Sequence, residues 1–196
     1  MMQWRSNPIL LLLAFFCLSS SSVFAACHAV SAAGAGTKNG SSWTNAFQFS
    51  TLSPVRGDVY YFADGTYGTL DFETAAAGTL TVTFKKAQSY DFGRTSDGCS
   101  NDISSGWNAS TMGASQAVFN SNTFGTTLYV NAPYFVMNGN GTTTTSGCGG
   151  TVQQLAALSF TASPPNPADC GFKLDNHTGG AAKEIYNASP STSHMA

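Results

Sequence analysis

The sequence predicts an all-β protein in which short strands wind into a solenoid. From Val59 onward, short runs of β-forming residues alternate with turn residues, and no long helical pattern separates them, which excludes a βαβ sheet. Charged residues make up only 9% of the chain, against roughly 25% in ordinary soluble domains. Aromatic residues make up 12%, enough to fill a core. The net charge of −2 gives no basic patch, so nucleic acid is not expected as a partner.

Residues 1–25 are predicted to be a signal peptide. Arg5 makes the amino-terminal region positive, residues 9–18 form an apolar run, and Val23 and Ala25 precede a cleavage site of small residues. The apolar run is too short to span a bilayer. We therefore expect a secreted or periplasmic protein that has no membrane association after signal removal. Lipoprotein processing at Cys27 is an alternative that the sequence leaves open.

The mature chain is predicted to begin with a leader and a short capping helix. Residues 26–40 are rich in small side chains and are expected to form a flexible leader with little to pack. Trp43, Ala46 and Phe47 follow at helical spacing behind Ser42, a candidate N-cap, which predicts a helix of about two turns. Trp43, Phe47 and Leu52 are expected to cover the open end of the first coil. Residues 41–196 are expected to form one β domain.

The strands are predicted from β-forming runs bounded by turn residues. They are residues 59–62, 69–72, 79–85, 117–119, 127–130, 134–137, 152–160 and 171–175. Alternation is clearest in residues 79–85, where Leu80, Val82 and Phe84 share one face and are expected to point into the core.

The connection ADGTYG at residues 63–68 decides between a hairpin and a corner. It contains Asp-Gly, the pair that favours a two-residue hairpin loop, but three more residues precede the next strand. A tyrosine between two turns, Tyr67, suggests a short corner with an inward-pointing side chain. Short strands with brief corners suit a coil in which each strand stacks on the strand one full turn later. A β-sandwich built from hairpins is the alternative fold.

Several motifs occur in an order that carries a family resemblance. They are the pairs Gly57–Asp58 and Gly78–Thr79, the segments 64–67 and 84–86, and the later strands at 116–119 and 134–139. This order resembles the first coils of secreted right-handed parallel β-helix proteins of the pectate lyase-like and polysaccharide lyase-like group. There, a capping helix precedes a GD-strand-AGTY coil and then a G-T-strand-K coil. The resemblance covers roughly residues 41–139 and implies a right-handed parallel β-helix.

The resemblance also implies polysaccharide binding along an outer face of the coils. In the lyases of this group, a Lys or Arg removes the proton beside a uronate carboxylate, whose charge Ca²⁺ or another cation neutralises. Lys85 and Lys86 are the candidates for contacting an acidic sugar, although lysines also keep an exposed strand end soluble. Trp107 is a candidate for stacking on a sugar ring, or else it covers the coil.

Asp97, Asn101 and Asp102 are candidate Ca²⁺ ligands, because they place side-chain oxygens close together in the segment SDGCSND. Asx-rich loops are also held in turns by their own side chains, so both interpretations stay open. No other cofactor is predicted. The chain has only two glutamates, and its eight aspartates are scattered singly and form no visible acid–base constellation, so the sequence does not decide whether the protein is an enzyme.

Four cysteines remain after signal removal. An even number in an oxidising compartment predicts disulfides, and the absence of CxxC or CxxH spacing argues against zinc. Four cysteines allow three connectivities. We expect Cys148 to pair with Cys170, the closest pair in sequence, which leaves Cys27 with Cys99.

Two functions fit these observations. The first is a carbohydrate-associated secreted protein that binds a polysaccharide or cell-surface glycan or forms part of a polysaccharide-degrading enzyme. The second is a non-catalytic structural or adhesive β-helix on a surface. The sequence ends as another strand begins, without a polar capping element. We therefore expect a fragment of a longer solenoid that is prone to self-association through its last coil.

Overall fold

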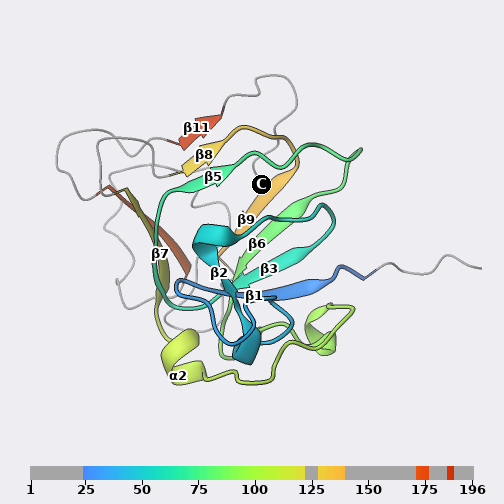
Figure 1. Ribbon diagram of the computed structural model, residues 1–196, viewed down its shortest axis with the longest axis vertical. Helices are drawn as coiled ribbons and strands as arrows, with labels where there is room; N and C mark the ends of the chain where they lie inside the picture. Colours follow the sequence, from blue (N-terminus) through green and yellow to red (C-terminus); the bar gives the residue numbers. More distant parts are fainter. Residues whose placement is uncertain (1–23, 122–127, 140–170, 177–184, 188–196) are drawn as a thin grey trace, which may run out of the picture.

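The computed structural model describes residues 24–121, 128–139, 171–176 and 185–187, and its regular structure consists mainly of parallel strands (Figure 1). The strands are β1 (Cys27–Ser31), β2 (Phe47–Gln48), β3 (Val59–Phe62), β4 (Gly65–Tyr67), β5 (Leu70–Phe72), β6 (Val82–Lys86), β7 (Gln116–Ser121), β8 (Leu128–Val130), β9 (Phe135–Asn138), β10 (Gly171–Asn176) and β11 (Ile185–Asn187). The helices are the 3₁₀ turns η1 (Trp43–Asn45), η2 (Phe49–Thr51) and η3 (Thr95–Asp97), and α2 (Ala109–Met112). The all-β class is as predicted.

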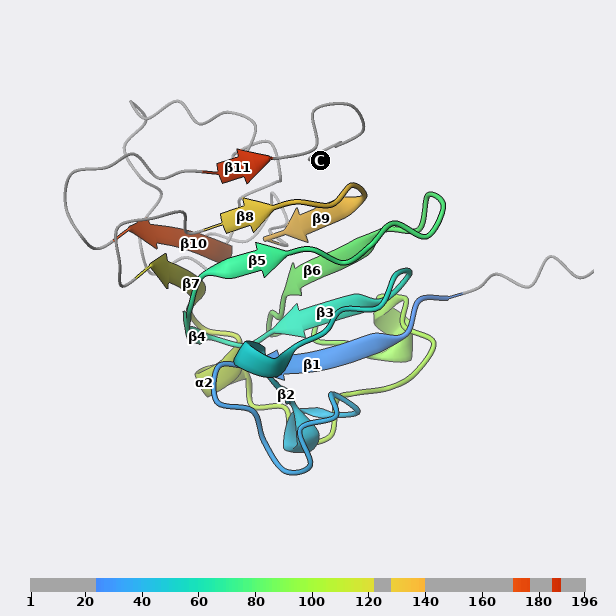
Figure 2. The ribbon, with the colours of Figure 1, turned by 45° about the horizontal axis from the view of Figure 1, so that its top comes forward.

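The strands form three parallel sheets. The first sheet has the order β2-β1-β3-β6-β9, the second β4-β7-β10 and the third β5-β8-β11. The chain visits the three sheets in turn, through β3, β4 and β5, then β6, β7 and β8, then β9, β10 and β11. Figure 2 shows the strands of each round stacked beside the equivalent strands of the previous one.

The segment ADGTYG is a corner, and the hairpin interpretation is wrong. β3 pairs with β1 and β6, whereas β5 pairs with β8, so the two flanking strands belong to different sheets. Three of the residues expected in the turn form β4 of the second sheet. Tyr67 is buried as expected, and its hydroxyl donates to the carbonyl of Ala63 at 2.9 Å. Because every ladder between the described strands is parallel, a sandwich built from hairpins is excluded for this part of the chain.

Side chains that face the space between the three sheets form the inner core. Its members come from all three sheets and are mostly aromatic or branched: Val30, Tyr60, Phe62, Tyr67, Leu70, Phe72, Val82, Phe84, Ala117, Phe119, Leu128, Val130, Ala132, Phe135 and Met137. Val82 and Phe84 point inward as the alternation predicted. Leu80 does not, because β6 begins only at Val82 and leaves Leu80 in an exposed connection.

A second apolar cluster, the outer cluster, lies on the opposite face of the first sheet. Its buried members are Cys27, Ala29, Trp43, Ala46, Tyr61, Ala63, Ala87, Cys99 and Ile103. Tyr61 alternates with the inner-core residues Tyr60 and Phe62, so the two clusters share β3 from opposite sides. The segment between β6 and β7, residues 87–115, which we call the insertion, thus covers the outer face of the first sheet (Figure 2).

The amino-terminal region differs from the prediction. Residues 27–31, expected in a flexible leader, form β1 between β2 and β3, with Ala29 and Val30 fully buried. Small side chains suit this strand because the outer cluster packs closely against it.

The predicted two-turn helix is replaced by η1, β2 and η2. The Ser42 side chain makes no capping hydrogen bond. Phe47, Phe49 and Leu52 pack against the inner core, and the Phe49 ring meets Phe62, Tyr67 and Phe119 edge-on. Trp43, expected in the same cover, lies in the outer cluster, and its indole N–H donates to the carbonyl of Phe92 at 3.0 Å.

Several predictions lie outside the described residues. They concern the signal peptide through residue 23, the strand at 152–160, and the pair Cys148 and Cys170. No helix within the described residues is both long and apolar enough to cross a membrane.

Arg56 ties the corners of successive rounds together. Its guanidinium carbon lies 5.2 Å from the centre of the Phe72 ring. Arg56 donates hydrogen bonds to backbone carbonyls in two connections, β5 to β6 and β8 to β9, and the acceptors are Thr74, Ala75, Leu80, Pro133 and Tyr134. This fan of bonds uses the several N–H groups of a guanidinium, which the ammonium of lysine cannot match.

We expect Arg56→Lys to lower the free energy of unfolding by about 1–2 kcal/mol, because the charge remains while most of the carbonyl contacts are lost. Urea unfolding followed by fluorescence measures the change. Lys38→Met removes a cation with a single exposed hydrogen bond to Gln48, and it should shift stability by less than about 0.5 kcal/mol. Equal urea unfolding midpoints for Arg56→Lys and the parent protein would show that the Arg56 hydrogen bonds do not stabilise these connections.

Candidate functional site

Lys86 is not on the surface, which corrects its assignment as a sugar contact. Its side chain is fully buried, and its Nζ bonds the carboxylate of Asp64 at 2.8 Å and the carbonyls of Ala87 and Met112. The second oxygen of Asp64 accepts the backbone N–H groups of residues 114 and 115. Lys86 and Asp64 therefore fasten the end of the insertion to the corner between β3 and β4.

Lys85 reaches the outer face of the first sheet but is held within the protein. Its Nζ lies 2.5 Å from Oδ2 of Asp91 and donates to the Tyr61 hydroxyl at 3.2 Å. The Tyr61 hydroxyl in turn donates to Oδ1 of Asp91. Burial, and then the charge of Asp91, raises the pKa of Tyr61, which therefore stays protonated. The Lys85 side chain keeps 17% of its surface exposed, so a sugar carboxylate would have to compete with Asp91.

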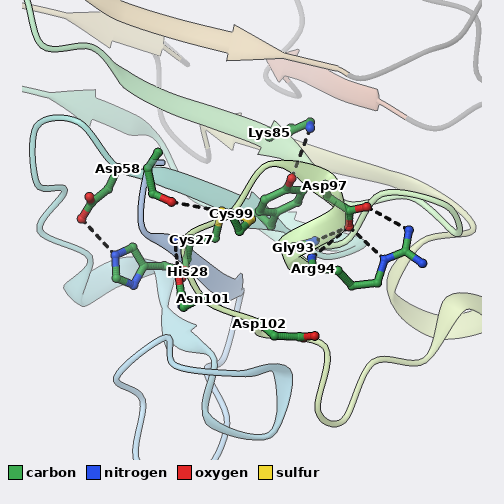
Figure 3. Close-up of a disulfide and its surroundings, with 12 residues drawn as sticks. Cys27, His28, Asp58, Lys85, Gly93, Arg94, Asp97, Cys99, Asn101 and Asp102 are labelled. Atoms are coloured by element: carbon green, nitrogen blue, oxygen red, sulfur yellow. Dashed lines mark hydrogen bonds and ion pairs between the residues drawn. A yellow bond between two sulfur atoms is a disulfide. The ribbon is translucent and has the colours of Figure 1, made fainter. Parts of the chain in front are cut away.

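The three candidate Ca²⁺ ligands hold separate parts of the loop (Figure 3). Asp97 accepts hydrogen bonds from the Arg94 side chain and from the backbone N–H groups of residues 92–94. Partial burial opposes the charge of this carboxylate, but these hydrogen bonds hold the pKa of Asp97 below its usual value. Asn101 bonds both backbone groups of Cys27, and Asp102 accepts the N–H of Ser104.

Asp97 and Asp102 hold turns of the loop, as the turn interpretation expects, whereas Asn101 joins the loop to Cys27. Within the described residues, no group of three or more His, Cys, Asp or Glu side chains is placed to hold a metal ion.

Cys27 and Cys99 form a disulfide, with an S–S distance of 1.99 Å and Cα atoms 5.5 Å apart. The bond fixes the insertion to β1 within the outer cluster, of which both cysteines are members (Figure 3). The sequence analysis expected this pairing, because Cys27 and Cys99 remain once Cys148 is paired with Cys170. A sulfur in this bond cannot also carry the lipid of a lipoprotein.

Trp107 belongs to the protein's own packing. Its ring stacks on Phe92 with centroids 4.9 Å apart and planes 2° from parallel, and it also contacts Trp43. Of the two interpretations of Trp107, covering the coil is the one that the structure supports.

The outer face of the third sheet carries residues that the sequence analysis did not select. Leu70 and Phe72 of β5 are buried, and Asp71 between them is exposed, as is Glu73 just beyond the strand. Tyr129 of β8 lies directly beside Asp71 in the ladder, between the buried Leu128 and Val130. We call Asp71, Glu73 and Tyr129 the outer row. The alternation in LDFE indicates that Asp71 and Glu73 face outward, but it does not indicate which strand lies beside them.

The outer row is acidic and aromatic. Burial, and then the nearby charge of Glu73, raises the pKa of Asp71. Carboxylates accept hydrogen bonds, and a tyrosine ring offers an apolar face with a polar tip. Parallel strands repeat such positions about every 4.8 Å, and Tyr186 of β11 occupies the next register position after Tyr129.

A further pair outside the sequence prediction is His28 with Asp58. The His28 ring stacks on Tyr60 at 4.9 Å, and its Nε2 lies 3.0 Å from Oδ2 of Asp58. Phe47 contacts the same ring. The His28 ring thus packs beside Tyr60, a member of the inner core.

Comparison with family models, curated proteins and solved structures finds no match to this chain.

Proposed function

We propose that the protein is a secreted, polysaccharide-binding right-handed parallel β-helix that holds its ligand on the outer row of the third sheet. The β-helix is supported by the repeated passage of the chain through three parallel sheets. The outer row carries the functional proposal, because Asp71, Glu73 and Tyr129 combine exposed carboxylates with an aromatic side chain on one regular surface. Hydroxyl groups of a sugar donate to the carboxylates while its C–H face packs on the ring.

The preferred ligand is a neutral or amino-bearing glycan rather than a uronate polymer. The outer row is acidic and repels carboxylates, while the two lysines considered for acidic sugars are respectively paired with Asp91 and buried against Asp64. The acids Asp58, Asp64, Asp91 and Asp97 all have internal partners as well. These assignments favour binding without turnover.

A non-catalytic structural role on a surface is the second candidate. The observation that favours it is the insertion after β6, which packs as a cover over the first sheet instead of projecting as a binding loop. Such a protein would present stable coils without recognising a sugar.

Affinity electrophoresis through gels that contain one polysaccharide each tests the proposal. A neutral galactomannan or β-glucan, or the amino polymer chitosan, should retard the mature protein, and pectate and alginate should not. Tyr129→Ala should weaken the interaction by about tenfold. The matched control is Thr66→Ala, on the exposed face of the second sheet, which should migrate like the parent.

The outcomes separate the candidates. Absence of retardation in every gel would contradict the binding proposal and favour the structural role. Retardation that Tyr129→Ala leaves unchanged would place the glycan elsewhere. Release of unsaturated products from pectate or alginate, detected by ultraviolet absorbance, would instead make the protein a lyase.

A further inference from the structure

Lys86 is the one lysine or arginine among the fully buried residues of the described chain, and its amino group is held in a fixed position. Nζ lies 2.8 Å from Oδ1 of Asp64, 2.7 Å from the carbonyl oxygen of Ala87 and 3.1 Å from that of Met112. The ammonium has three N–H groups, so these three acceptors account for all of them. The nitrogen therefore lies against Oδ1 of the Asp64 carboxyl group, the oxygen that is bonded to the carbon atom Cγ.

The other oxygen of Asp64 has an equally defined environment. Oδ2 accepts the backbone N–H groups of Ala114 and Ser115, each at 2.9 Å. Two convergent backbone N–H donors are the arrangement that stabilises the negative oxygen of a tetrahedral intermediate in acyl transfer. The carboxyl group thus presents one oxygen to the amine and the other to a pair of donors.

We propose that Lys86 and Asp64 condense into an intramolecular amide, which crosslinks β6 to the corner between β3 and β4. Proximity and orientation replace a separate activating reagent, because the two groups are held in contact in one geometry. The crosslink joins neighbouring rounds of the chain across 22 residues of sequence.

The reaction balances without a further reactant. A proton moves from Nζ to Oδ1 along their hydrogen bond, which converts the ion pair into a neutral amine and a carboxylic acid. Nζ then attacks Cγ, and the charge that develops on Oδ2 is held by the two backbone N–H groups. A second proton passes from Nζ to Oδ1, the Cγ–Oδ1 bond breaks, and Oδ1 leaves as water. The third proton stays on the amide nitrogen.

Burial favours the neutral pair that starts this reaction. Desolvation lowers the pKa of Lys86, although its hydrogen bond to Asp64 and the charge of Asp64 oppose the shift. The side chain of Asp64 keeps 13% of its surface exposed, so the released water has a route to solvent. The adjacent residue Lys85 lacks this environment. Its side chain is partly exposed, and its carboxylate partner Asp91 also accepts a hydrogen bond from the Tyr61 hydroxyl.

Mass spectrometry of the mature, reduced and denatured protein tests the proposal. The intact mass should fall below the sequence mass by one water molecule, and protease digestion should yield a branched peptide joined between residues 64 and 86. Lys86→Met and Asp64→Ala should each have their full sequence mass. Lys85→Met is the matched control and should keep the loss of water.

The parent protein alone can overturn the proposal, even if the Lys86 and Asp64 variants do not fold. A full sequence mass, with the peptides containing Lys86 and Asp64 recovered separately, would show that the pair is only ionic. Loss of water that maps to other residues would have the same consequence. The result is independent of glycan binding, so failure of either proposal leaves the other standing.

Discussion

Replacing Phe62 with alanine is expected to lower the free energy of unfolding by about 3–5 kcal/mol, the usual cost of deleting a buried ring. The Phe62 side chain has no exposed surface and lies at the centre of the inner core. Its ring contacts aromatic rings from η2, from the first sheet and from the second sheet, at centroid distances from 4.9 to 6.1 Å. These are the rings of Phe49, Tyr67, Phe84, Phe119 and Phe172.

Denaturant unfolding of Phe62→Ala measures the loss, and Leu80→Ala is the control. The sequence places both residues in apolar strand patterns, but Leu80 is 54% exposed, so its truncation should change stability by less than about 0.5 kcal/mol. Similar losses at the two positions would mean that Phe62 does not occupy a closed core between the sheets.

Removing the disulfide between Cys27 and Cys99 should cost about 4 kcal/mol. The two residues are separated by 72 positions, and the chain-entropy estimate for a loop of that size gives this value. The measurement is the unfolding midpoint of a Cys27→Ala/Cys99→Ala double variant. Alanine is the appropriate replacement because both cysteines are buried in the outer cluster, where serine would add a polar group.

Removal of the disulfide should loosen the insertion before it affects the sheets. Limited proteolysis of the double variant is expected to cut between η3 and α2 before it cuts β3 or β6, because the disulfide fixes this segment to β1. Alkylation of the denatured, unreduced parent protein supplies the contrary test. Labelling of Cys27 and Cys99 as free thiols would show that the bond does not form.

The strands β3, β5, β6 and β10 and the corner between β3 and β5 were predictable because they depend on local signals, whereas β4 lies within residues expected to form a turn. The alternation at Val82 and Phe84 and the corner containing Tyr67 follow from neighbouring residues. All three side chains are buried as expected. The amino-terminal elements were not predictable in this way. Trp43 and Phe47 have helical spacing, but they pack on opposite faces of the first sheet, which only the completed sheet defines.

The candidate site shows the same limit. Lys86 looks like a surface lysine at a strand end, and its burial depends on Asp64 and on the carbonyl of Met112, which are distant in sequence. Trp107 likewise finds Phe92 only when the insertion folds back. The outer row also requires long-range information, because β5 and β8 become neighbours only through the winding of the chain.

Carboxyl footprinting tests the central proposal most directly, namely that a glycan binds the outer face of the third sheet. The mature protein is labelled with a carbodiimide and an amine, with and without the neutral galactomannan, and the modified residues are quantified by mass spectrometry. We expect the polysaccharide to reduce labelling of Asp71 and Glu73 and to leave Asp102, an exposed aspartate in the insertion, unchanged. Unchanged labelling of Asp71 and Glu73 at polysaccharide concentrations that retard the protein would contradict the proposed binding face.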